Sequence, residues 1–177
     1  MPTVTDYTAL LSGDYWNGSD TTGQPGVVVG QPVIVTYSFP TSAPGYDTSA
    51  PPPGLTAATA ATFQAFNAAE QIQARNALAK WAAASGIVFI EVAPGKGDIN
   101  FQKVDLTGTS FAGKGGVAYY PFGDHSSFSD PYYSGDLTAS GDVFMNTQMA
   151  INDGTLLHEI GHALGLKHPT ETTFGHD

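Results

Sequence analysis

The sequence predicts an α+β fold in which a mixed, twisted β-sheet of about five strands carries helices on one side. Three observations lead to this prediction. Short segments with strand patterns recur along the chain, whereas two segments have the periodicity of a helix. One helix falls between the first two strands, and the other, which bears two histidines, comes last. The 21 glycines and 12 prolines indicate many turns and connecting loops rather than a helical bundle.

The first strand is expected over residues 33–39, where the residues alternate between two faces with a period of two. Pro40 ends this strand. The segment 40–62 contains three consecutive prolines, which cannot donate hydrogen bonds to a sheet, and we expect a loop there. Residues 1–31 are polar and rich in turns, so they are expected to form a loosely structured amino-terminal arm with Trp16 as its one large anchor.

A helix is expected over residues 68–85. Asn67 is a capping residue that lies three positions before Glu70, in a variant of the capping box. Three apolar residues then follow at helical spacing, Ala74, Leu78 and Trp81. Gly86 is expected to end the helix in the left-handed conformation. We interpret this helix as a packing element that covers the sheet.

Four further strands are expected, over residues 87–92, 98–102, 116–120 and 142–146. Because a helix separates the first strand from the second, those two are expected to be parallel neighbours. The later strands follow one another closely, which allows at least one antiparallel pair. The sheet is therefore expected to be mixed.

Composition excludes several kinds of function. Six Lys and Arg residues against 16 Asp and Glu residues give a net charge of −10, which argues against a nucleic-acid partner. The absence of cysteine excludes disulfides and cysteine-based catalytic or metal sites. The amino terminus lacks the pattern of a secretory signal peptide, and no segment approaches the roughly 18 apolar residues of a membrane span. We therefore expect no membrane partner.

The segment that carries chemistry is His-Glu-Ile-Gly-His-Ala-Leu-Gly-Leu-Lys-His-Pro, which begins at His158. His158 and His162 are one helical turn apart, so both imidazoles project from one face and can bind a single ion. Glu159 lies about 100° around the helix axis from His158, where it can act as a general base without binding the ion. Gly165 can turn the backbone so that His168 supplies a third ligand.

Three imidazoles and one open coordination position are typical of a catalytic zinc site. Zinc-bound water has a pKa of about 7, and Glu159 could take its proton and deliver it to the leaving amine. The two histidines and the glutamate alone would arise by chance on the order of three times in a thousand chains of this composition. The glycine and third histidine reduce that expectation to on the order of one in 100,000. Histidines that merely pair on a polar helix face are disfavoured, because the surrounding residues are apolar.

This segment resembles the zinc signature of the metzincin peptidases, and especially that of the serralysins, which are secreted bacterial zinc proteases. The order of strands and helices over about residues 15–169 is similar to that of the serralysin catalytic domain. The resemblance implies that His158, His162 and His168 are zinc ligands and that Glu159 is the catalytic base. It also implies one catalytic zinc ion, an extracellular location and an extended peptide or protein as substrate; we expect a monomer.

The resemblance further implies that residues 116–120 form an exposed edge strand on which a substrate peptide pairs through its backbone. Gly116, Val117, Ala118 and Tyr119 are therefore candidate substrate-binding residues. In serralysins the third histidine is followed by a methionine-containing turn and a tyrosine, and then by calcium-binding repeats. The present sequence contains none of these three features after His168. Residues 32–177 are accordingly expected to be the upper subdomain of the catalytic domain without its lower subdomain. Calcium is possible in the parent protein and unsupported in this chain.

Two functions from different classes are compatible with these observations. The first is a secreted zinc metalloendopeptidase. The alternative is a zinc-binding fragment of such a protease that is inactive, or that is autoinhibited because the amino-terminal arm fills the cleft. A purely structural acidic domain would bind no metal.

Overall fold

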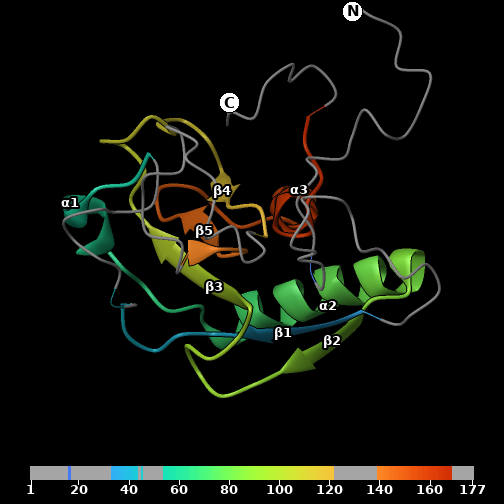
Figure 1. Ribbon diagram of the computed structural model, residues 1–177. Helices are drawn as coiled ribbons and strands as arrows, with labels where there is room; N and C mark the ends of the chain where they lie inside the picture. The colour runs from blue at the N-terminus through green and yellow to red at the C-terminus, as the bar shows by residue number, and fades with distance from the viewer. Residues whose placement is uncertain (1–15, 17–32, 44, 46–53, 122–138, 169–177) are drawn as a thin grey trace, which may run out of the picture.

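The computed structural model describes residue 16 and the ranges 33–43, 45, 54–121 and 139–168. The amino-terminal arm expected over residues 1–31 lies outside these residues, except for Trp16. The described residues form a five-stranded mixed sheet with helices, which confirms the predicted fold class (Figure 1). In the described part of the chain, no helix is both long and apolar enough to cross a bilayer.

The strand order across the sheet is β2-β1-β3-β5-β4. The strand bounds are Ile34–Ser38 for β1, Val88–Glu91 for β2, Ile99–Val104 for β3, Gly116–Ala118 for β4 and Val143–Asn146 for β5. Strands β1 and β2 are parallel, with Ile34 opposite Val88, as the helical crossover between them predicts. Strand β4 is the one antiparallel member of this sheet and lies at its edge, next to β5. The expectation of at least one antiparallel pair is therefore confirmed.

Helix α2 covers Ala68–Ser85 and begins and ends as predicted. The Asn67 side chain accepts hydrogen bonds from the backbone N–H groups of Ala69 and Glu70, at 2.9 and 3.0 Å. The Glu70 carboxylate accepts one from the N–H of Asn67 at 2.7 Å, which completes the capping box. Gly86 follows with φ of 76°, in the left-handed region.

The prediction that residues 40–62 are a loop throughout is wrong in its last part. A short helix, α1, covers Ala57–Ala60. The Thr56 side chain caps it by accepting a hydrogen bond from the N–H of Thr59 at 3.1 Å. The three prolines limit the backbone only up to Pro53, and the alanine-rich segment after Gly54 has no residue that opposes a helical turn.

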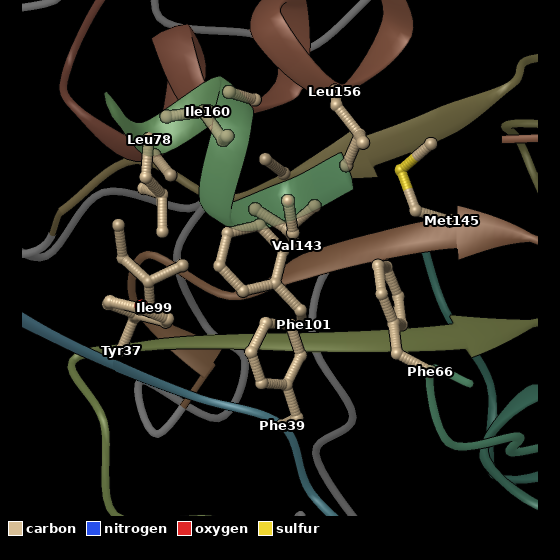
Figure 2. Close-up of a cluster of buried hydrophobic side chains, with 14 of the residues drawn as sticks. Tyr37, Phe39, Phe66, Leu78, Ile99, Phe101, Val143, Met145, Leu156 and Ile160 are labelled. Atoms are coloured by element: carbon tan, nitrogen blue, oxygen red, sulfur yellow. The ribbon is translucent and has the colours of Figure 1, made fainter. Parts of the chain in front are cut away.

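Both longer helices pack on the same face of the sheet, as predicted. Buried residues of α2 and of α3, which covers Asp153–Ala163, join sheet residues in one core cluster (Figure 2). In this view Leu78 of α2 and Ile160 of α3 gather with Ile99 and Phe101 of β3. A second cluster lies on the opposite face and includes Phe144 of β5. Helix α3 thus lies between α2 and the edge strand β4 (Figure 1). This position places the residues of α3 beside the edge of the sheet.

Candidate metal centre and its cleft

Helix α3 presents two histidines from one face. Asn152 caps its amino terminus by accepting a hydrogen bond from the N–H of Thr155 at 3.0 Å. His158 and His162 are one turn apart on this helix, and their Nε2 atoms lie 3.0 Å from each other. Buried apolar residues on the other sides of α3 fix it against the core, so the two rings are held on a rigid element.

The backbone turn after α3 brings the third histidine to the same point. Gly165 has φ of 93°, as its place at the helix end predicts. The N–H of Leu166 donates to the carbonyl oxygen of Gly161 at 2.9 Å, which closes the turn. His168 Nε2 consequently lies 3.1 Å from His158 Nε2. The structure therefore brings together the three histidines that the sequence singled out.

A backbone carbonyl determines the tautomer of one ring in this group. The carbonyl oxygen of Leu166 lies 2.6 Å from Nδ1 of His162, so Nδ1 carries the proton and the lone pair of this ring is on Nε2. Nε2 of His158 carries either one proton or one lone pair. It therefore cannot form hydrogen bonds to Nε2 of His162 and Nε2 of His168 at the same time. Burial lowers the pKa of His158, and the charges of His168 and Lys114 lower it further, which favours the neutral ring.

The spacing of the three rings matches the donor set of zinc. Two imidazole nitrogens bound to one tetrahedral zinc ion at about 2.0–2.1 Å are about 3.3 Å apart. The observed separations of 3.0 and 3.1 Å are close to that value, and ligand atoms of all three residues lie within 4.8 Å of one another. The chemistry of this donor set therefore fits a zinc site with an open position.

Glu159 lies beside the histidines and is itself buried. Its side chain reaches β4, where the backbone N–H of Ala118 donates to the carboxylate. Burial raises the pKa of Glu159 to about 7, although Lys114 and the hydrogen bond from Ala118 act in the opposite direction. The carboxyl group is thus poised to hold or release a proton near neutral pH.

The histidines and Glu159 open into a cavity of about 480 Å³ between α3 and β4. Of the four candidate substrate-binding residues, Gly116, Val117 and Ala118 line this cavity. The ring of Tyr119 lies on the opposite face of the sheet, in the second core cluster, where burial raises its pKa. Strand β4 is the edge strand that the resemblance implied, although its side chains are buried.

Backbone directions distinguish these four residues further. The N–H of Tyr119 donates to the carbonyl oxygen of Asp142, and the carbonyl of Gly115 accepts from the N–H of Asn146. Successive residues of a strand direct their backbone groups to opposite sides. Gly116 and Ala118 therefore direct theirs away from β5, towards the edge of the sheet.

Two features of the cleft were missed from the sequence. Lys114 lines the cavity, and its charge acts on both Glu159 and His158. The ring of Tyr120 lies edge-on to that of His162, with centroids 5.9 Å apart. The spacing of the histidine signature gives no information about Lys114 or Tyr120. The sequence offered only their positions, just before and within the strand expected over residues 116–120.

The sequence matches the family model described as Matrixin, of the peptidase M10 group, over residues 56–173. The chain belongs to the matrixin family. The match includes α2, the four strands β2 to β5 and the three histidines, and it leaves out β1. The metzincin resemblance is therefore confirmed. Family membership thus agrees with the zinc-type donor set that the geometry shows.

Individual relatives of this matrixin include serralysins and a metalloprotease. Serralysin A of Dickeya chrysanthemi is 34% identical over 165 residues, which are 90% of this chain and 30% of that protein. Serralysin of Proteus mirabilis is 31% identical over 175 residues, covering 90% of this chain and 31% of that protein. Metalloprotease AprA of Pseudomonas entomophila is 34% identical over 151 residues, 81% of this chain and 27% of that protein. The chain therefore spans about three tenths of the length of these relatives.

Proposed function

We propose that this chain is the zinc-dependent endopeptidase part of a serralysin-type protease and hydrolyses peptide bonds in extended substrates. The observation that carries the proposal is the convergence of three imidazole Nε2 atoms beside the buried carboxyl group of Glu159, in a cleft bordered by a sheet edge. Membership of a peptidase family supports the same class of reaction. The extracellular location that the resemblance implies stays a prediction.

His158, His162 and His168 would hold the metal. A zinc ion there would polarise the carbonyl of the bond to be cleaved and would lower the pKa of water from 15.7 to about 7. The carbonyl of Leu166 holds His162 in the tautomer that binds through Nε2.

Glu159 is assigned the proton transfers. Its carboxylate would take a proton from the attacking water and return it to the nitrogen of the leaving amine. The hydrogen bond from Ala118 fixes one side of this carboxylate against β4, and the helix places its base next to His158. Both contacts limit the positions that the carboxyl oxygens can take.

Strand β4 is assigned the binding of substrate backbone. A peptide laid along the edge would form hydrogen bonds with the backbone groups of Gly116 and with the carbonyl of Ala118, because the N–H of Ala118 already donates to Glu159. Tyr119 would contribute indirectly, since its N–H holds β4 to β5. Pairing through the backbone requires an extended substrate and makes few demands on its side chains.

The test compares zinc content and proteolysis across matched variants. Zinc per chain is measured by mass spectrometry, and cleavage of an unfolded protein is followed for wild type, Glu159→Gln and His162→Ala. Glu91→Gln is the control, because it makes the same chemical change on β2 at the opposite edge of the sheet. We expect one zinc and cleavage in wild type and the control, one zinc without cleavage in Glu159→Gln, and loss of zinc in His162→Ala.

Other outcomes overturn separate parts of the proposal. One zinc per chain with no cleavage by wild type would favour the alternative of an inactive zinc-binding fragment. Full zinc occupancy in His162→Ala would refute the ligand assignment. Unchanged cleavage by Glu159→Gln would refute the role of Glu159 as base.

A further inference from the structure

Lys114 lines the cleft and forms no ion pair with any described residue. The six Lys and Arg residues are few in a chain of net charge −10. Three of them form ion pairs of 2.7–3.0 Å with carboxylates, namely Arg75, Lys80 and Lys103. Lys114 forms no such pair within the described residues, and it is the one Lys or Arg among the described residues that line the cavity.

The base of Lys114 is fixed although its side chain is exposed. Its N–H donates to the carbonyl oxygen of Phe111 at 3.0 Å, and its own carbonyl accepts from the Asn146 side chain at 2.9 Å. Lys114 lies two residues before Gly116, where β4 begins. The side chain therefore starts from a fixed point at one end of the edge to which we assign the substrate backbone, and its ammonium group lies within a side-chain length of that point.

The charge of Lys114 reaches the reacting region. Lys114 lines the same cavity as Glu159 and His158, so its positive charge faces the centre of the cleft. A net charge of −10 disfavours the approach of an acidic peptide in general, and Lys114 places a positive charge in the cavity where such a peptide would bind. A substrate carboxylate bound near it would form the ion pair that no described carboxylate forms with Lys114.

We propose that Lys114 is a specificity-determining residue that favours substrates with an Asp or Glu side chain near the cleaved bond, on the side where β4 begins. This inference rests on the proposed peptidase function. An ion pair between exposed groups changes an equilibrium by about two- to fivefold, and we expect a preference of that size in kcat/KM. A selectivity of several hundredfold would need a more buried pair than this one.

The experiment profiles cleavage of a mixed peptide library and reads the ratio of Glu to Gln at each position around the cut. Wild type is compared with Lys114→Met, which keeps an apolar stem of similar length, and with Lys114→Glu. Lys96→Met is the matched control, because Lys96 also forms no ion pair within the described residues and lies in the turn after β2, away from β4. The ratio within each variant is independent of any change in its overall rate.

We expect wild type and Lys96→Met to prefer Glu by about two- to fivefold at one position, Lys114→Met to lose the preference, and Lys114→Glu to disfavour Glu there. Raising the ionic strength should reduce the wild-type preference. The same profile in wild type and Lys114→Met would overturn this proposal alone. Absence of cleavage by wild type would overturn the proposed function and this proposal with it.

Discussion

Replacing Gly116 by alanine tests how closely strand β4 and helix α3 must approach. A Cβ atom at this position would lie 3.0 Å from Cγ of Glu159 and 3.0 Å from the carbonyl oxygen of Phe144. Sulfur Sδ of Met145 would be 3.1 Å away. Such contacts are tighter than a real Cβ atom normally makes, so a neighbour must shift by a few tenths of an ångström. The Phe144 oxygen belongs to the backbone of β5, which leaves the Glu159 side chain as the part that moves.

The size of the effect follows from that displacement. Overpacking of a filled region costs about 1–3 kcal/mol of stability. A misplacement of about 1 Å in a reacting group can reduce a rate by about 100-fold. The shift at Gly116 is a fraction of that, so for Gly116→Ala we expect a decrease in kcat of about 3- to 10-fold. One zinc per chain should be retained, because none of the three atoms nearest to the added methyl group belongs to a histidine.

The assay measures kcat and KM for hydrolysis of a peptide, together with zinc content and the free energy of unfolding. Gly115→Ala is the control: the three atoms nearest to its Cβ would all belong to Thr155, with Cγ2 at 3.1 Å, and none to Glu159. We expect the control to keep most of the wild-type kcat. A wild-type kcat in Gly116→Ala, or an equal loss in both variants, would refute the reasoning.

Three further predictions concern stability. Asn67→Ala should lower the free energy of unfolding by about 1 kcal/mol in urea denaturation, because the capping box is lost; an unchanged midpoint and slope would contradict this. Trp81→Phe keeps an aromatic ring but removes the donor to the carbonyl of Leu157, 3.1 Å away, and should cost about 0.5–1.5 kcal/mol with chelator present. Hydrogen bonds from Arg75 lower the pKa of Glu91 in the folded state, so the stability from this pair is present above about pH 4.5 and is lost as the pH falls through the lowered value. The slope of stability against pH below 4.5 should be shallower in Glu91→Gln, and an unaltered slope would exclude the pair as its source.

Local sequence determined the parts of the fold and site that could be predicted. The capping box at Asn67 and the left-handed glycine after α2 depend on residues within a few positions of each other, and both are present. The convergence of the histidines also depends on one helix and one turn, with Gly165 supplying the bend. These features need no knowledge of distant segments.

Contacts between distant segments could not be predicted. The Trp81 indole holds a carbonyl of α3 that is 76 residues away in sequence, and periodicity identified only that Trp81 faces the core. The helix α1 was missed because the prolines before it dominated the interpretation of the segment. The charge of Lys114 in the cleft depends on the pairing of β4 with β5, which strand patterns alone do not specify.

The central claim is that three imidazoles of this chain hold one zinc ion. X-ray absorption at the zinc edge tests it directly, on protein purified without chelator and loaded to one zinc per chain. The account predicts three imidazole nitrogens at about 2.0–2.1 Å, from His158, His162 and His168, with an oxygen ligand in the remaining position. A spectrum with fewer than three imidazoles, or protein that retains no zinc, would contradict it.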